Sequence, residues 1–75
     1  MGVFLVGQEV FHWQWFGKSS VYIRSERVVC DDDDGSVIAV ASGSRVAFRA
    51  RKEAYASKLA AIRAAEANGL RVLEP

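Results

Sequence analysis

Residues 51–68 limit the possible folds more than any other part of this chain. The segment is rich in alanine, lysine, arginine and glutamate and contains neither proline nor glycine, so its residues lose little side-chain entropy in a helix. Gly69 follows as a stop, because glycine adopts the left-handed conformation at a helix end without a steric penalty. The sequence therefore predicts one long helix over residues 51–68. Its start is expected to be frayed or supported by a strand, since no capping residue directly precedes Arg51.

Two rows of side chains run along this predicted helix. An apolar stripe at helical spacing is expected to face a core, and it consists of Tyr55, Leu59, Ile62 and Ala65. A parallel row carries only methyl groups and consists of Ala56, Ala60, Ala64 and Ala67. This row is either an ordinary exposed helix surface or a close contact with the helix of a second copy.

The preceding residues have the patterns of strands. Strands are expected at residues 3–6, 8–16, 20–30, 36–41 and 45–50, with a short final strand at 70–73. Turn residues separate them at 17–19, at 31–35, where Asp34-Gly35 favours a tight turn, and at 42–44. Residues 24–27 are polar on both faces, which predicts a bulge or bend within the second long strand.

The first long strand has a heavily aromatic face. Phe11, Trp13 and Trp15 alternate with smaller and polar residues, and their rings are expected to fill the core under the alanine-rich helix. In that case the outer face of the sheet carries His12, Gln14, Tyr22 and Arg24. The alternative is that the rings stack on nucleic-acid bases, with phosphates contacted by Arg24, Arg27, Arg45 and Arg49.

Size and composition indicate one globular domain covering residues 1–75. A hydrophobic fraction of 51% with 25% charged residues excludes disorder as the default. One cysteine and one histidine are too few for an internal disulfide or a structural zinc site. Because domains this small are marginally stable, a partner that stabilises the fold is expected, and a second copy forming a homodimer is one candidate.

Charge and hydropathy restrict the partners. There is no run of about 20 apolar residues and no secretory signal pattern at the start, so no membrane is expected and the cytoplasm is the expected location. The net charge of +1 favours neither nucleic acid nor anionic lipid. Charge is clustered, however, with an acidic run at Asp31–Asp34 and a basic segment from Arg45 to Lys52.

The residues capable of chemistry do not form a recognisable site. The aspartate run does not match an EF-hand calcium loop, which needs oxygen ligands at positions 1 and 12 and glycine at position 6. Placing Gly35 at position 6 puts Cys30 at position 1 and Ala41 at position 12. The aspartate run is expected to be a solvated turn, or a carboxylate patch facing a basic partner. Pairing of the two long strands would place His12 opposite Arg24 and far from Cys30, so neither catalysis nor a cofactor or metal is expected. Cys30 is then a partly buried small residue, and His12 a surface residue.

The segment Val6-Gly7-Gln8-Glu9-Val10, opening a meander of short strands, loosely resembles SH3-like barrels. The small size and lack of motifs also resemble the small proteins of phages and other mobile elements, many of which bind a host protein. Neither resemblance assigns a role to any residue.

The sequence thus predicts an α+β domain: an antiparallel meander of four to five short strands, SH3-like or open, with one long C-terminal helix packed across it. We expect a non-enzymatic protein-interaction module that self-associates and docks on or occludes a partner. The alternative is a small nucleic-acid-binding protein using the aromatic residues and the segment from Arg45 to Lys52. Candidate contact residues are His12, Gln14, Tyr22, Arg24, Asp32, Asp33, Asp34, Arg45 and Arg49.

Overall fold

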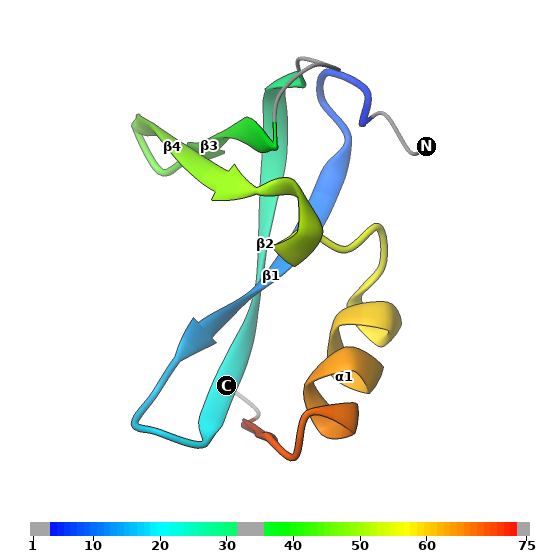
Figure 1. The fold of residues 1–75 in the computed structure, drawn as a ribbon. Helices are drawn as coiled ribbons and strands as arrows, with labels where there is room; N and C mark the ends of the chain where they lie inside the picture. The colour runs from blue at the N-terminus through cyan, green and yellow to red at the C-terminus, as the bar shows by residue number, and fades with distance from the viewer. Residues whose placement is uncertain (1–3, 32–35, 74–75) are drawn as a thin grey trace.

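The computed structural model describes residues 4–31 and 36–73. Its elements in chain order are β1 (Glu9–Trp15), β2 (Ser20–Asp31), β3 (Val37–Ser42), β4 (Arg45–Ala50), the 3-10 turn η1 (Arg51–Glu53), α1 (Lys58–Ala67) and β5 (Arg71–Leu73). The first four strands form an antiparallel meander in the order β1-β2-β3-β4, and β5 pairs in parallel with β2. The predicted α+β class, with a helix packed across a meander, is confirmed (Figure 1).

The β1–β2 hairpin is the longest pairing in the molecule and has the register expected from its turn. Glu9 lies opposite Arg27, His12 opposite Arg24 and Trp15 opposite Val21. The two ribbons cross one another in Figure 1, as strong right-handed twist requires in a long hairpin. β5 pairs with β2 at its start and β3 pairs with it at its end, so β2 connects both halves of the fold.

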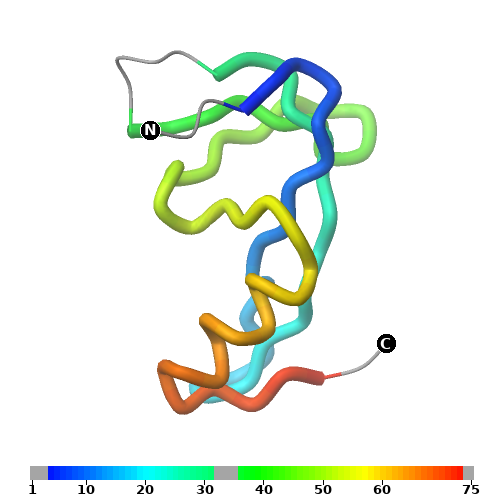
Figure 2. Tube along the Cα trace, turned by 90° about the vertical axis from the view of Figure 1, so that its right-hand side faces the viewer, coloured from blue at the N-terminus to red at the C-terminus, as the bar shows by residue number. Residues whose placement is uncertain are grey.

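Two separate groups of buried residues hold the two halves. Near the β3–β4 end the buried cluster consists of Val10, Val28, Ile38 and Val40. At the other end, where α1 packs on β1, β2 and β5, the buried residues are Val21, Ala61 and Ala65. The two groups use alternate faces of the pleated hairpin. The twist nevertheless brings β4–η1 and α1 to the same side of it, as Figure 2 shows.

Two strand predictions need correction. Residues 4–6 were expected to lie in a leading strand but form none, and a turn runs from Leu5 to Gln8. There the side chain of Gln8 accepts the N–H of Leu5 (3.0 Å) and the N–H of Gln8 donates to the carbonyl of Leu5 (3.0 Å). The bulge in β2 falls between Val28 and Cys30 instead of at residues 24–27. The polar stretch stays regular because its backbone pairs continuously with β1.

The predicted long helix is also wrong at its start, because α1 begins only at Lys58. Tyr55 is extended and exchanges two backbone hydrogen bonds with Phe11 (both 2.8 Å), which adds a bridge to the outer edge of β1. Ser57 then caps the helix, since its hydroxyl accepts the N–H of Ala60 (3.1 Å). The stop at Asn68-Gly69 is as predicted, with Gly69 at a φ of 76°.

The buried face of α1 differs from the predicted stripe. Ala61 and Ala65 face the sheet, whereas Leu59 is 56% exposed. The small alanine side chains let the helix approach β1 closely enough for the indole Nε1 of Trp13 to donate to the carbonyl of Ala61 (3.0 Å). The ring of Trp13 also stacks on Tyr55, with centroids 5.9 Å apart. Trp13 therefore packs under the helix as predicted, but Trp15 is 54% exposed and lies outside the core.

Replacing Ser57 with alanine tests the cap. We expect Ser57→Ala to lower the free energy of unfolding by roughly 1 kcal/mol, because the N–H of Ala60 loses its acceptor. Ser57→Asp, which keeps an acceptor, should retain most of the stability in urea denaturation. Equal stability of the wild type and Ser57→Ala would show that the cap does not hold α1.

The Trp13 contact is tested by comparing two tryptophans on the same strand. We expect Trp13→Phe to cost about 1 kcal/mol or more, because it removes the indole donor and part of the ring stacked on Tyr55. Trp15→Phe should change the free energy of unfolding by less than about 0.5 kcal/mol. Thermal unfolding followed by far-UV circular dichroism measures both, and equal losses would contradict the assignment.

Candidate interaction surface

A polar pocket lies between the β1–β2 hairpin and β4. Its cavity volume is about 620 Å3. The residues around it come mainly from the first two strands and from β4: His12, Trp13, Gln14, Trp15, Arg24, Glu26, Ser42, Phe48, Arg49, Ala50 and Glu53. Three of the predicted contact residues, namely His12, Gln14 and Arg24, are therefore brought together with Arg49, a fourth, in one concave surface instead of on a flat outer sheet face.

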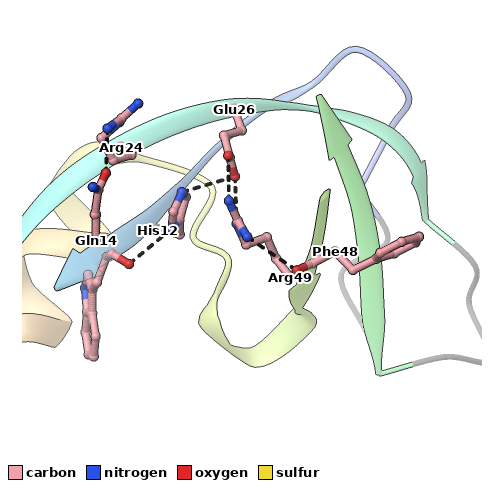
Figure 3. A network of polar contacts seen from close by, with 7 residues as sticks. His12, Gln14, Arg24, Glu26, Phe48 and Arg49 are labelled. Atoms are coloured by element: carbon pink, nitrogen blue, oxygen red, sulfur yellow. Dashed lines mark hydrogen bonds and ion pairs between the residues drawn. The ribbon is translucent and has the colours of Figure 1, made fainter. Parts of the chain in front are cut away.

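Glu26 is at the centre of the contacts in this pocket (Figure 3). Its carboxylate accepts two hydrogen bonds from Arg49, from Nε (2.9 Å) and Nη2 (2.8 Å), and Nε2 of His12 lies 3.1 Å from Oε1. Nδ1 of His12 faces the carbonyl of Trp13 at 3.1 Å. Both imidazole nitrogens thus face acceptors, and the doubly protonated ring can donate to both. His12, predicted as a surface residue, is instead largely enclosed, with 13% of its side chain exposed.

The surroundings of Glu26 keep it ionised. Burial raises the pKa of its carboxyl group. The hydrogen bonds from Arg49, the charges of His12 and Arg49, and a hydrogen bond from Ser42 lower the pKa, and together they outweigh burial. The net effect is a pKa below the ordinary value of 4.5. Because the Glu26 side chain is only 8% exposed, these donors are needed to compensate for its lost hydration.

Other predicted contact residues take part in local contacts. The guanidinium of Arg24 donates to the side-chain carbonyl of Gln14 across the β1–β2 pair. Tyr22, opposite Gln14 on β2, packs edge-on against Phe16, with centroids 5.7 Å apart. Arg45 is exposed and makes no ion pair with another described residue. Asp32, Asp33 and Asp34 lie outside the described residues.

Asp31 does not belong to a solvated turn as the sequence suggested. It ends β2, its side chain is fully buried, and its carboxylate accepts the N–H of Phe4 (2.6 Å). Its Oδ1 forms an ion pair with Arg51, held by charge rather than by an aligned hydrogen bond. The first aspartate and the first residue of η1 therefore tie the end of β2 to the end of β4.

A second surface, the outer face of β3–β4, is apolar and uncovered. Its side chains alternate with those that enter the Val10 cluster, and they belong to Val37, Ala39, Ala41, Val46 and Phe48. Val46 is 57% exposed and Phe48 70% exposed. Figure 3 shows the ring of Phe48 directed away from Glu26 and Arg49. Cys30, predicted to be partly buried, is exposed beside this face, where the bulge in β2 places it opposite Ala39.

β4 also has a free edge. It is the last strand of the meander, and no other strand of the described chain pairs with its outer side. The N–H of Arg51 donates to the carbonyl of Ser36 (2.7 Å) just beyond the β3–β4 ladder. Hydrogen-bonded and non-hydrogen-bonded pairs alternate in such a ladder, so the backbone groups of Val46 and Phe48 point to the free edge. This edge and the outer face together form what we term the β4 surface.

The described part of the chain shows no group of three or more His, Cys, Asp and Glu residues able to hold a metal ion. Among the same residues, no helix is long and apolar enough to cross a membrane. Comparison with known proteins finds no matching family model, no matching curated protein and no matching solved structure. Any function must therefore be argued from the geometry of this chain alone.

Sequence reasoning missed Glu26 and the β4 surface. Glu26 lies in a polar stretch without any motif, and only the folding of β4 over the hairpin brings Arg49 to it. Val46 and Phe48 alternate with Arg45, Ala47 and Arg49, a pattern that is usual for a half-buried strand. The sequence therefore carries no signal that these two apolar side chains face outward.

Glu26 makes stability depend on pH in a defined direction. Its folded-state pKa lies below 4.5, its value in an unfolded chain, so its contribution is complete above pH 4.5 and is lost as the pH falls through the lowered folded-state value. We expect Glu26→Gln to cost about 1–3 kcal/mol at pH 7 and the difference from wild type to shrink toward acid pH. Urea denaturation from pH 7 to 3 measures this, with Glu9→Gln, an exposed carboxylate on β1, as the control. A constant difference across this range would contradict the assignment.

Proposed function

We propose that this domain is a protein-interaction module that binds a partner protein through the β4 surface. The observation that carries the proposal is the exposure of Val46 and Phe48 on a strand that pairs with no other described strand along one edge. Isolated exposed apolar residues are ordinary on protein surfaces, but a contiguous apolar face beside an open strand edge is typical of an interaction site.

Burying Val46 and Phe48 against a partner would contribute substantially to the free energy of binding. Burying a side chain such as valine or phenylalanine contributes roughly 1.5–3 kcal/mol. Two such residues with two pairs of backbone groups can support a specific contact, provided that the ordering costs of association are met. In the free domain the same residues contribute nothing to the buried clusters, which consist of other side chains.

The geometry supports nucleic-acid binding less than it supports protein binding. Of the four arginines that would contact phosphates, Arg49 is held by Glu26, Arg24 by Gln14, and Arg27 donates to the carbonyl of Gly7 (3.1 Å). Trp13 is held under α1 by its hydrogen bond to Ala61. Binding nucleic acid through these groups would require several of these contacts to be exchanged.

The proposal is tested by affinity capture from a lysate of the encoding organism, with and without nuclease. We expect a discrete protein to be retained after nuclease treatment and to be lost with the double variant Val46→Thr/Phe48→Thr, because threonine keeps the strand propensity but removes the apolar contacts. Leu59→Gln serves as the control, since Leu59 is about as exposed as Val46 but lies on α1.

Two results would contradict the proposal. One is capture that disappears with nuclease and falls steeply between 50 and 200 mM salt, which indicates nucleic acid. The other is capture that the double variant leaves intact. Circular dichroism and thermal unfolding of all variants establish that loss of capture is not loss of folding.

A further inference from the structure

We propose that the β4 edge binds an extended segment of a different protein in which acidic and apolar side chains alternate, in the pattern acidic–apolar–any–apolar–acidic. This inference rests on the proposed function and specifies the partner. The segment would add a strand beside β4, a mode of recognition in which backbone hydrogen bonds supply affinity and alternate side chains supply specificity.

The backbone of β4 is suited to such an addition. The N–H and C=O groups of Val46 and Phe48 point to the open edge, and no described residue pairs with them except through a long contact of 3.4 Å from Arg49 to the carbonyl of Phe48. β4 contains no proline and no bulge in its pairing with β3, so its ladder can be extended once the Arg49 side chain releases the carbonyl of Phe48.

The side chains of β4 specify the pattern. Residues directly opposite each other in adjacent strands place their side chains on the same face. Added residues opposite Val46 and Phe48 therefore extend the outer apolar face, and those opposite Arg45 and Arg49 lie on the inner face beside two cations. Arg45 makes no ion pair with another described residue, while Arg49 shares its charge with Glu26. Carboxylates at both ends of the added segment complement this arrangement.

A second copy of the domain fits the same edge less well. Antiparallel self-pairing that keeps the faces matched can place Val46 opposite Phe48 of the other copy, but then Arg45 lies opposite Arg49 of that copy, and like charges directly opposite are destabilising. Pairing shifted to bring the two Phe48 residues together leaves Arg45 outside the β4 ladder and still unpaired. A foreign acidic segment avoids this repulsion and supplies a carboxylate to Arg45, while Arg49 keeps its pair with Glu26.

The experiment uses the full chain labelled with 15N and three capped synthetic peptides. These are GEVTVEG, its charge-reversed form GKVTVKG, and GEVTVEG with both valines N-methylated, which removes their backbone donors. Amide shifts and hydrogen exchange are followed during titration to several millimolar. We expect GEVTVEG to shift and protect the amides of Val46 and Phe48, and both control peptides to bind about tenfold or more weakly.

Matched variants test the charge pairing between the peptide and Arg45. We expect Arg45→Glu to weaken GEVTVEG by about tenfold and to strengthen GKVTVKG, whereas Arg63→Glu, an exposed arginine on α1, should leave both affinities nearly unchanged. The inference is overturned by equal binding of the two charge forms, by equal binding of the N-methylated peptide, by shifts that map away from β4, or by no binding at all. Protection of the Val46 and Phe48 amides that rises with protein concentration alone would identify a second copy as the occupant and would also overturn it.

The two proposals can fail separately. If lysate capture depends on Val46 and Phe48 but no peptide binds at β4, the partner uses the apolar face without adding a strand, so the inference fails and the proposed function stands. If capture is also independent of these two residues, both fail.

Discussion

Backbone pairing between β1 and β2 is the interaction on which the rest of this domain depends. The hairpin spans both halves of the molecule, and its twist turns alternate faces toward the same side (Figure 2). A chain of 75 residues cannot build one large core, and this twist lets it build two small ones. Either half would lose its support if the register of this pairing shifted by one residue.

Each half is then completed by a contact that reaches back to the hairpin. At one end the ion pair between Asp31 and Arg51 and the bonds from Arg49 to Glu26 hold β4 over the Val10 cluster. At the other end the hydrogen bond from Trp13 to Ala61 holds α1 on the hairpin, where Val21 is buried. Because β4 is covered only on its inner face, closing the core at this end leaves Val46 and Phe48 outside it.

Much of the fold could be read from local patterns. The turns at 17–19 and 42–44, the register of the first hairpin, the five strands and the end of the helix all follow from residues close in sequence, where glycine and the apolar alternation act directly. The start of α1 could not be read this way. Residues 51–57 have the composition of a helix, but Tyr55 contributes more as a bridge to Phe11, which is distant in sequence, than as another helical turn. The contact site is the least predictable part, because exposure of Phe48 depends on which elements fail to cover it.

The sequence by itself determined the class of the fold, the meander order of β1 to β4 and the stop at Gly69, because each rests on backbone preferences and periodicity expressed within a few residues. Only the tertiary structure decided which alanines face the sheet, that Asp31 is a buried anchor, that Glu26 is clasped by His12 and Arg49, and that β4 is left with an open edge. These outcomes depend on how a twisted hairpin distributes limited apolar surface among distant segments, and no local pattern encodes that distribution.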